Sequence, residues 1–463
     1  MRPVLANLGF VLQIGGFFIT LPVAVAFFYN ETQPLIAFFI TGFALFILGF
    51  LLNAFSERKE MDIKSSSILI TATFFLLGLF GSIPYFYINM FNDADIFARF
   101  TNNYFESISG YTTTGFSLLT NIDSLPKSIV FYRGLTQFIG GLGIVFILLA
   151  FFYKGDTIDY LRRVMGLLKV TDSIKKSFLY VLAIYSFYIA VFTAALYFLG
   201  FTDLVNTVSV VFGSLMTGGL SPVSDFSRFL VFPANIIIIL SMFLGATTFA
   251  IHFRLLTGKF RKAMTSELIA FILIILGFTA LLTFYYNIEA SLSLFTVVSA
   301  SSTTGYSTVN ISAFSETLKI IFVFLMIIGG TSVSTAGGMK ILRLLVYLKA
   351  VPWAVRWAVY GKEQKFVFDE REFTPSEIIL SLLVTLMALT TIVVSAVIFT
   401  AAGFPFINSL FESASAFATA GLSTGIVSLS LAPALKWLLA LVMILGRIEI
   451  IPFLIIFTRK KAT

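Results

Sequence analysis

A short motif of small residues occurs four times in this sequence. Each copy consists of an apolar run, then small or hydroxyl-bearing residues, then a glycine that is followed by a large apolar residue and serine. The copies centre on 113–117, 217–221, 303–307 and 419–423, with Gly115, Gly219, Gly305 and Gly421 at equivalent places. Repetition of this kind indicates one structural element used several times. We therefore expect four similar segments around one shared axis.

Long apolar stretches flank every copy. Their length of about 20 residues is what a helix needs to cross a bilayer. The sequence is 58% hydrophobic and only 12% charged, whereas soluble proteins are about a quarter charged. The alternating strands of a membrane β-barrel are not the pattern here. The prediction is an all-α polytopic membrane protein.

Composition also excludes several kinds of site. The sequence has no cysteine and one histidine, His252, which excludes disulfides, thiolate metal sites and histidine clusters. Its net charge of +8 is better explained by basic cytoplasmic loops than by nucleic acid binding. A membrane-embedded enzyme is the alternative from another class, but the spans lack paired polar catalytic groups. No dinucleotide-binding or phosphate-binding glycine motif occurs, so we expect no enzyme and no organic cofactor in this chain.

The order of the apolar segments divides the chain into five parts. Residues 1–56 form an N-terminal helical hairpin that carries no motif, and four units follow at 57–164, 165–260, 261–364 and 365–463. Each unit is expected to contain a helix, a short pore segment and a second helix. The pore segments are predicted at 99–117, 204–221, 290–307 and 405–423, and the second helices at 128–153, 230–256, 316–350 and 431–458. Because the pore segments are too short to span a bilayer, they fit re-entrant half-helices between ten spanning helices.

Basic residues predict the orientation in the membrane. Most of the 31 lysines and arginines fall on one side if every pore segment enters from the other. The exceptions are Arg447, inside a span, and six residues assigned to the outer side: Arg99, Lys127, Arg133, Arg228, Lys319 and Lys436. Basic loops face the cytoplasm. Both termini are therefore predicted to be cytoplasmic, in a prokaryotic plasma membrane.

The repeated motif has the chemistry of a cation site. A half-helix that ends near mid-membrane directs its carbonyl oxygens, the negative end of its dipole, at the axis. Glycine then permits the positive φ that a turn of exposed carbonyls needs, and a ring of such oxygens replaces the water around K⁺. The residues of this predicted filter are Thr113, Thr114, Gly115, Thr217, Gly218, Gly219, Thr303, Thr304, Gly305, Thr419, Ala420 and Gly421. The alternative for each copy is close packing between membrane helices.

Two further features are candidates for gating. The second helix of the third unit, at about 35 residues, is too long for one crossing. A Gly/Ser/Thr tract at 329–338 should break it and leave a polar loop below the filter; a kink for packing is the alternative. The predicted gating residues are Gly329, Gly330, Thr335, Gly337, Gly338 and Arg447. A buried arginine is expensive and indicates function, although a structural pair with a neighbouring helix is the alternative for Arg447.

Other polar residues in the sequence are less specific indicators of function. Glu106 and Glu412 hold the same place in two pore segments, where we expect them to fix the helices by hydrogen bonds. His252 is expected to be structural. Five aspartates at the outer mouth either concentrate cations or are ordinary loop charges: Asp93, Asp95, Asp123, Asp203 and Asp225.

These motifs resemble those of the Trk/Ktr/HKT superfamily of potassium transporters, and most of all its TrkH-type subunit. The pore segments are similar to the family's four-fold filter. Residues 133–143 resemble the opening of its first inner helix, 328–340 its intramembrane gate loop, and 445–450 the TrkH-type form of its last inner helix. The resemblance covers 1–463. It implies K⁺ as the transported ion, with Rb⁺ expected to substitute, because sodium-preferring relatives have serine at the place of Gly115.

The resemblance also implies partners and a mode of action. It implies potassium uptake through a backbone-carbonyl filter, a homodimer, and cytoplasmic nucleotide-binding regulatory subunits of the RCK type. We expect the basic loops at 154–176 and 351–374 to be their contact surfaces. Gly218 and Ala420 depart from the threonine of the other motifs, but both keep a carbonyl oxygen. The alternative is a Na⁺-coupled or mixed K⁺/Na⁺ carrier that binds ions at broken helices.

Overall fold

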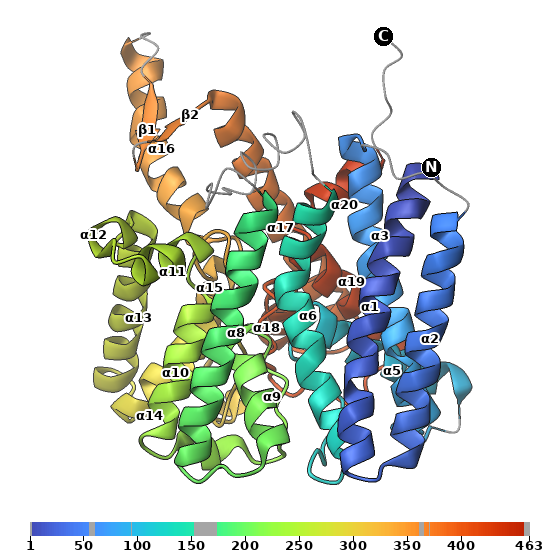
Figure 1. The fold of residues 1–463 in the computed structure, drawn as a ribbon. Helices are drawn as coiled ribbons and strands as arrows, with labels where there is room; N and C mark the ends of the chain where they lie inside the picture. Colours follow the sequence, from blue (N-terminus) through green and yellow to red (C-terminus); the bar gives the residue numbers. More distant parts are fainter. Residues whose placement is uncertain are drawn as a thin grey trace.

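The structure, a computed structural model, describes residues 2–54, 61–93, 95–151, 174–360, 365–369 and 371–457. Its longer helices run between two opposite faces of the molecule (Figure 1). One face carries a short β-sheet, and we call it the hairpin face. The first helix, α1 (Arg2–Phe28), begins there, and the last, α20 (Ile451–Ile456), lies near it. The two ends of the described chain therefore share a side, as predicted.

The N-terminal helices α1 and α2 (Thr32–Ala54) form a closely packed hairpin. Both are apolar along nearly their whole length. They approach closely because small residues lie at the contact: a β-carbon at Gly9 would meet the backbone of Gly49. Contacts between small residues are a general means of packing membrane helices.

Four sets of helices follow, each built around a short helix, and we call these sets units one to four. Unit one consists of α3 (Ile63–Gly81), α4 (Ile83–Tyr87), α5 (Ile96–Tyr111) and α6 (Lys127–Phe151). Unit two consists of α8 (Ile174–Phe198), α9 (Leu204–Leu215), the 3-10 turn η1 (Phe226–Leu230), α10 (Ala234–Gly245), α11 (Phe249–Leu256) and α12 (Phe260–Ala263).

Units three and four repeat this order. Unit three consists of α13 (Ser266–Phe284), α14 (Ala290–Ser301), the 3-10 turn η2 (Ile311–Ala313), α15 (Glu316–Ile328) and α16 (Ile341–Tyr360). Strands β1 (Phe366–Phe368) and β2 (Arg371–Phe373) come next. Unit four consists of α17 (Pro375–Ala401), α18 (Phe406–Phe417), α19 (Pro433–Arg447) and α20.

The four short helices α5, α9, α14 and α18 correspond to the predicted pore segments, and we call them the pore helices. Each ends two residues before the first residue of its motif. Asp95 and Asp203 cap the first two, because their carboxylates accept hydrogen bonds from the N–H groups of the first turn. Nearly every residue in the second half of each helix is buried. The pore helices therefore begin near one face and end inside the protein.

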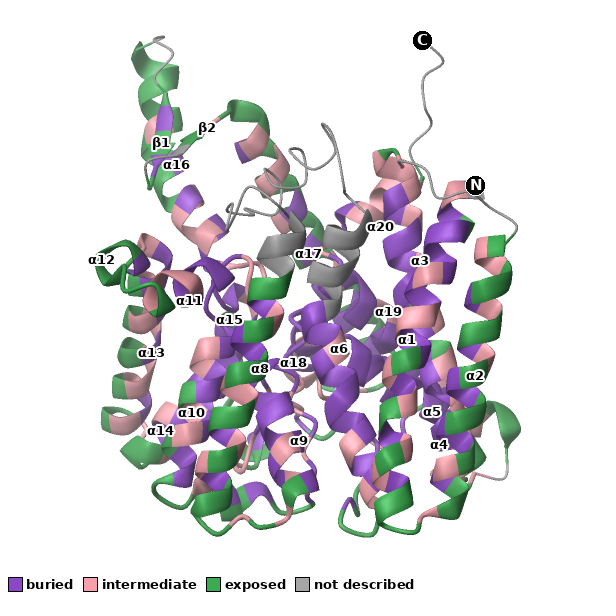
Figure 2. Cartoon of the chain, viewed as in Figure 1, coloured by how far each residue is buried: buried purple, intermediate pink, exposed green. Residues whose placement is uncertain are grey.

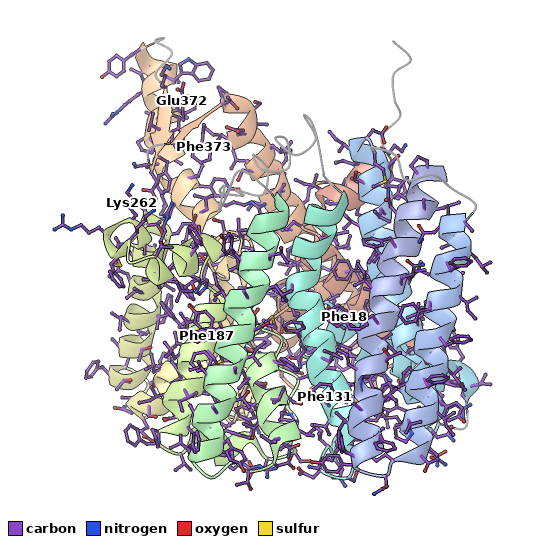
Figure 3. All side chains as sticks on the ribbon, in the orientation of Figure 1. Phe18, Phe131, Phe187, Lys262, Glu372 and Phe373 are labelled. Atoms are coloured by element: carbon purple, nitrogen blue, oxygen red, sulfur yellow. The ribbon has the colours of Figure 1, made fainter. Side chains whose placement is uncertain are left out.

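The outer helices form an apolar belt. Buried residues concentrate on α6, α18 and α19, whereas α2, α8 and α13 expose much of their surface (Figure 2). Much of that exposed surface is large and apolar, for example Phe43, Phe187 and Leu273. Phe187 lies within the belt, while Lys262 and Glu372 lie near the hairpin face (Figure 3). A wide apolar surface on a folded chain marks contact with a membrane.

Ten spanning helices were predicted, and fewer than ten helices of the described chain qualify as continuous spans. Six helices of the described chain are long and apolar enough to cross a membrane, or seven if α10 and α11 count as one span. The predicted helix at 230–256 is wrong, because α10 and α11 meet at 111°. The predicted helix at 431–458 is also wrong, because Glu449 and Ile450 adopt positive φ and separate α19 from α20. Apolar residues flank both breaks, so hydropathy does not reveal them.

One element was not predicted at all. Strands β1 and β2 form an antiparallel pair in which Phe366 lies opposite Phe373. Phe366 and Phe368 pack with Val346 of α16 and Ile378 of α17. The all-α prediction therefore holds for the membrane-embedded part, with this small sheet added beyond it at the hairpin face (Figure 1).

Candidate functional site

The four motifs meet in a closed ring. At each motif glycine, a β-carbon would collide with the carbonyl oxygen of the residue that precedes the glycine in the next unit. The contacts are Gly115 with Gly218, Gly219 with Thr304, Gly305 with Ala420, and Gly421 with Thr114. They run from unit one to unit four and back to unit one. Motifs from all four units are thus brought together, in the order of the sequence.

The backbone of the ring is strained in the same way in every unit. The first residue of each motif is a threonine with a φ between 50° and 56°, and the glycine two residues later has a φ between 68° and 86°. The threonines are Thr113, Thr217, Thr303 and Thr419. A threonine rarely adopts positive φ, and strain of about 1–3 kcal/mol per residue is typical of functional sites. Four equivalent threonines in this conformation indicate that the ring has a function.

Hydrogen bonds hold each motif to the end of its pore helix. The N–H of the second motif residue donates to a carbonyl oxygen five residues earlier, at 2.8–2.9 Å in all four units. The pairs are Thr114 with Ser109, Gly218 with Gly213, Thr304 with Ser299, and Ala420 with Ser415. With this N–H occupied in the pore helix, the carbonyl oxygen of the same residue is left to face the neighbouring unit.

The two motifs without threonine at their second position lack a side-chain hydrogen bond that the other two form. In unit one the hydroxyls of Thr112 and Thr114 are hydrogen-bonded at 2.8 Å, and in unit three Ser302 and Thr304 form the same pair at 2.7 Å. Units two and four have Met216 with Gly218 and Ala418 with Ala420 at these places, which cannot form it. The substitutions at Gly218 and Ala420 therefore remove a side-chain bond and leave a carbonyl oxygen in the ring.

Glu106 and Glu412 fix the segments that follow two of the motifs. The Glu106 carboxylate accepts hydrogen bonds from the Ser117 hydroxyl at 2.9 Å and from the Leu118 N–H at 3.0 Å. The Glu412 carboxylate accepts equivalent bonds from Ser423 and Thr424, at 2.8 and 2.7 Å. Both glutamates lie behind the ring, so they support the motifs by hydrogen bonds, as expected.

Arg133, which the sequence assigns to the outer side, is buried inside the protein near the start of α6. It forms an ion pair with Glu106 at 2.8 Å. It also donates to the Ser117 hydroxyl and to the Ser221 carbonyl oxygen. Arg133 therefore joins the segments after the first and second motifs. The signal in the sequence was an arginine within an apolar span, together with a glutamate in the pore segment before it.

Lys319 and Lys436 were also assigned to the outer side and are likewise buried. The Lys319 ammonium donates to Asn408 of the next pore helix at 3.0 Å. The Lys436 ammonium donates to Asn102 of the first pore helix at 2.6 Å and to the Leu429 carbonyl oxygen. Each lysine therefore links one unit to the next, from three to four and from four to one.

The predicted gate loop lies directly against the ring. It connects α15 to α16, which confirms the predicted break. The Gly337 N–H donates to the Thr303 hydroxyl at 2.7 Å, and the Thr335 hydroxyl lies 3.3 Å from that of Thr217. Among the described residues, the hydroxyl oxygens of Thr113 and Thr419 have no hydrogen-bond partner. The loop thus engages the motif threonines of units two and three and leaves those of units one and four unpaired.

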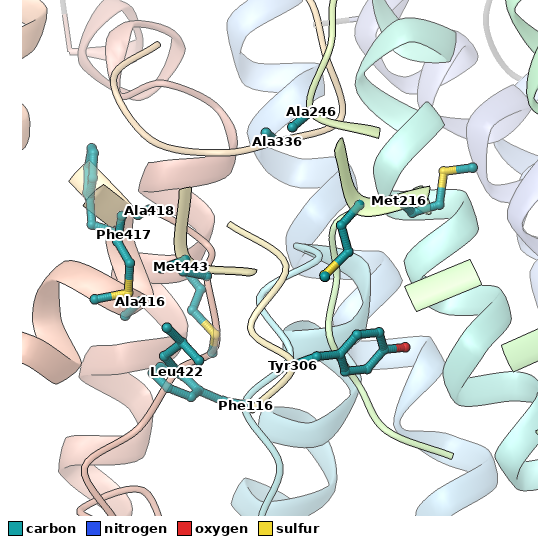
Figure 4. Close-up of a cluster of buried hydrophobic side chains, with 14 of the residues drawn as sticks. Phe116, Met216, Ala246, Tyr306, Ala336, Ala416, Phe417, Ala418, Leu422 and Met443 are labelled. Carbon is teal, nitrogen blue, oxygen red and sulfur yellow. The ribbon is translucent and has the colours of Figure 1, made fainter. Parts of the chain in front are cut away.

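Glycines allow the gate loop to fold tightly. Gly329 has a φ of 68°, and a β-carbon there would meet the carbonyl oxygen of Gly337. Gly338 has a φ of 75° and lies against Gly329 in the same way. A β-carbon at Gly330 would meet Ala246, whose side chain lies beside Ala336 of the loop (Figure 4). The loop therefore fills the space between the ring and the α10–α11 bend.

Arg447 connects the gate loop to α6. Its guanidinium donates to the carbonyl oxygens of Thr335 at 2.9 Å, Gly140 at 2.6 Å and Gly141 at 3.2 Å. The nearby Glu449 forms its ion pair with Arg343 of α16. Arg447 is thus held by neutral oxygens, next to the loop that lies below the ring.

The five aspartates of the outer mouth make local contacts. Besides the two helix caps, Asp93 accepts from Asn102, Asp225 caps η1, and Asp203 also forms an ion pair with Lys127. Desolvation by burial acts to raise the pKa of the Asp123 carboxyl group. Hydrogen bonds from Ser224 and the positive charge of Arg228 outweigh this effect, so the pKa of Asp123 is lowered. These contacts favour the interpretation as ordinary loop charges.

His252 has the contacts of a structural residue rather than of a metal ligand. His252 is buried and lies within hydrogen-bond distance of Thr247 and Tyr188. These contacts favour a structural role. Among the residues that the structure describes, no three His, Cys, Asp or Glu side chains are grouped to hold a metal ion. The ring of carbonyl oxygens is therefore the principal candidate site for a cation.

Known proteins of one family match this chain along nearly its whole length. The family model of the TrkH cation transport protein matches residues 34–284 and 263–462. A cation transporter of Methanocaldococcus jannaschii, itself described as uncharacterised, is 30% identical over 98% of this chain and 94% of its own. The Trk system potassium uptake protein TrkH of Escherichia coli is 26% identical over 95% of this chain and 94% of its own.

A solved structure has the same fold. The crystal structure of the potassium transporter TrkH from Vibrio parahaemolyticus superposes with a TM-score of 0.86, covering 99% of this chain and 98% of that one, at 24% identity. The resemblance that the motifs indicated is therefore confirmed. This chain belongs to the TrkH family of cation transport proteins, which are integral membrane transporters and not enzymes.

Proposed function

We propose that this protein takes up K⁺ through the ring formed by its four motifs. The observation that carries the proposal is the closure of that ring, in which each motif glycine lies against a carbonyl oxygen of the next unit. Four equivalent segments that meet in this way form a natural axis for a pore. The division of the chain at 57–164, 165–260, 261–364 and 365–463 follows from the same repeat.

The chemistry of the ring suits K⁺. Its inner surface would be formed by backbone carbonyls of 113–115, 217–219, 303–305 and 419–421, which are neutral oxygens of weak field. Such oxygens replace the hydration shell of K⁺ at little cost. The pore helices end just before the motifs, so the negative ends of their dipoles point toward a bound cation. Relatives named as potassium uptake proteins support this choice of ion.

The gate loop and Arg447 would close the path below the ring. The loop occupies two of the four motif threonines, at Thr217 and Thr303, through its own hydroxyl and N–H groups. Arg447 places a positive charge beside the loop and ties it to α6 through carbonyl oxygens. We infer that conduction requires the loop to move and Arg447 to release Thr335.

The surroundings of the pore follow from the same proposal. The hairpin face would be cytoplasmic, because the basic segments fall there. A homodimer and a cytoplasmic RCK-type regulatory subunit would complete the system. The described part of 351–374 protrudes at this face (Figure 1) and would be one contact surface. The other predicted surface, 154–176, falls mostly on residues 152–173, which lie outside the described residues.

Uptake of ⁸⁶Rb⁺ into proteoliposomes tests the filter. We expect K⁺ to compete far better than Na⁺ for the wild-type protein and this preference to disappear in Gly115→Ser. At Gly115 the φ of 86° and the contact with Gly218 leave no place for a side chain. Elution of the variant as a folded protein on size-exclusion chromatography is the control. Equal competition by Na⁺, or a variant that keeps its preference, contradicts the proposal.

A Na⁺-coupled or mixed carrier is the second candidate. The observation in its favour is that three second helices are broken: α10–α11, α15–α16 and α19–α20. Broken helices hold the ion sites of many secondary transporters. Uptake of ⁸⁶Rb⁺ that saturates and requires Na⁺ on the same side would replace the filter proposal with this one.

A further inference from the structure

Glu267 holds the gate loop from the side away from the ring. It lies in the first turn of α13 and is 8% exposed. Its carboxylate accepts a hydrogen bond from the Ser332 N–H at 2.7 Å and one from the Ser332 hydroxyl, whose oxygen lies 2.7 and 2.9 Å from the two carboxylate oxygens. A buried donor that is left without a partner costs about 1–3 kcal/mol, and Glu267 satisfies both donors of Ser332. Ser332 is therefore firmly fixed to the beginning of α13.

Two further contacts of the loop, on the side of α10 and α11, are of a different kind. Thr331 and Thr335 donate to the carbonyl oxygens of Ala246 and Gly245, at the bend between α10 and α11. These partners are neutral backbone groups. Among the hydrogen bonds of the described residues, the bonds from Ser332 to Glu267 are the ones that attach the loop to a carboxylate. Ser332 lies three residues before Thr335, which contacts both the ring and Arg447.

The residue before Glu267 is attached to the β-sheet at the hairpin face. The N–H of Ser266 donates to the Asp369 carboxylate at 3.2 Å, and its hydroxyl donates to the same carboxylate at 2.5 Å. Asp369 lies in the turn between β1 and β2, with a φ of 44°. Two adjacent residues of α13 therefore bind the sheet on one side and the gate loop on the other.

We propose that Glu267 is a latch that holds the gate loop against the ring, and that the β1–β2 sheet sets this latch through Asp369 and Ser266. The proposal rests on the gating role given to the loop above and deepens it. A displacement of the sheet would pull on Ser266, shift the first turn of α13 and weaken the bonds from Ser332. The sheet would thereby pass a force from the hairpin face to the gate without contacting the pore.

Uptake of ⁸⁶Rb⁺ by the purified protein alone, in proteoliposomes, tests the latch. We expect Glu267→Ala to raise uptake several-fold, because both Ser332 donors then lose their hydrogen-bond partner at the start of α13. Glu267→Gln should keep uptake near the wild-type level. Its amide oxygen can accept from the Ser332 N–H, while its amide N–H donates to the Ser332 hydroxyl. A residue that only supports folding would instead lower uptake when replaced, and an unchanged or lowered uptake in Glu267→Ala overturns the proposal.

The role of the sheet is tested by a matched pair of variants. Asp369→Ala should raise uptake, and Glu267→Ala combined with Asp369→Ala should raise it no further than Glu267→Ala alone, since both act on one contact. Glu372→Ala is the control, because Glu372 pairs with Lys365 within the same segment. It should leave uptake unchanged. Independent, additive effects of Glu267 and Asp369 overturn the proposed route from the sheet.

A third measurement follows the loop itself and separates the two proposals. The chain has no cysteine, so Val333→Cys provides a unique thiol beside Ser332. Its rate of modification by a water-soluble thiol reagent should rise with Glu267→Ala and stay low with Glu267→Gln; equal rates contradict the latch. Arg447→Ala serves as the gate control. If it raises uptake while Glu267→Ala does not, the latch is wrong and the gate stands, and if neither does, the gating proposal fails.

Discussion

A side chain at Gly421 would collide with the carbonyl oxygen of Thr114, so the last motif of the chain lies directly against the first. This contact closes the ring, because the other three contacts already link units one to four in order. The order of the sequence thus becomes the order of the units around the proposed pore. The first prediction uses this contact.

Gly421→Ala should abolish the preference for K⁺ over Na⁺, since the methyl group displaces an oxygen of the ring. Gly425→Ala is the matched control. Gly425 also has a positive φ, of 93°, but a β-carbon there meets nothing within 4 Å. Its replacement should cost about 1–2 kcal/mol of stability from backbone strain alone and leave the ion preference intact. Competition of ⁸⁶Rb⁺ uptake by both ions measures the difference, and equal behaviour of the two variants would contradict the ring.

Replacing Arg447 should open the gate. Arg447→Ala removes the three bonds to Thr335, Gly140 and Gly141, together with a positive charge beside the path, and should raise the uptake of the isolated protein. Arg447→Lys keeps the charge but lacks the forked donor groups that reach several oxygens at once. Its uptake should lie between those of wild type and Arg447→Ala. Equal uptake by all three proteins would exclude a gating role for Arg447.

The buried pair of Arg133 and Glu106 should be a major contributor to stability. Glu106→Ala leaves the guanidinium without its carboxylate, and breaking a buried pair in this way costs about 3–5 kcal/mol. Adding Arg133→Met should recover part of this loss, because the uncompensated charge is removed. Thermal unfolding in detergent measures both. The interpretation would be wrong if the double variant were no more stable than Glu106→Ala.

Glu31 should stabilise the attachment of the N-terminal hairpin. Its carboxylate accepts hydrogen bonds from the Lys127 N–H at 2.5 Å and the Ser128 N–H at 3.0 Å, at the start of α6. Loss of such a cap costs about 0.5–2 kcal/mol. Glu31→Ala should therefore lower the unfolding temperature without changing ion preference. Glu289→Ala is the control, since Glu289 precedes α14 without a capping bond, and equal losses in both variants would exclude the cap.

The sequence was sufficient to predict the parts of the structure that repeat or that break a pattern. The motifs could be aligned because Gly115 and its three equivalents share a place, and their common conformation follows from that repetition. The break at 329–338 could be predicted because glycine, serine and threonine interrupt an apolar helix. Whether these residues bind and gate an ion stays a prediction, which the experiments above address.

Other features depend on contacts between distant segments. The bend after Gly245 and the break after Arg447 lie between apolar runs, so the hydropathy pattern does not reveal them. The burial of Arg133 could not be predicted because its partner, Glu106, lies in another helix. The bonds between Glu267 and Ser332 join residues 65 positions apart, and no local pattern indicates that these two residues meet. Such contacts become visible only when the units are packed together.

Locating the ion itself tests the central claim most directly. Crystals of the protein grown in Rb⁺ and measured at an X-ray wavelength where Rb⁺ scatters anomalously would show where the ion lies. We predict a peak on the axis of the ring, in contact with carbonyl oxygens of Thr114, Gly218, Thr304 and Ala420. An ion bound instead at the α10–α11 bend or the α19–α20 break, with none in the ring, would contradict the filter and favour the coupled carrier.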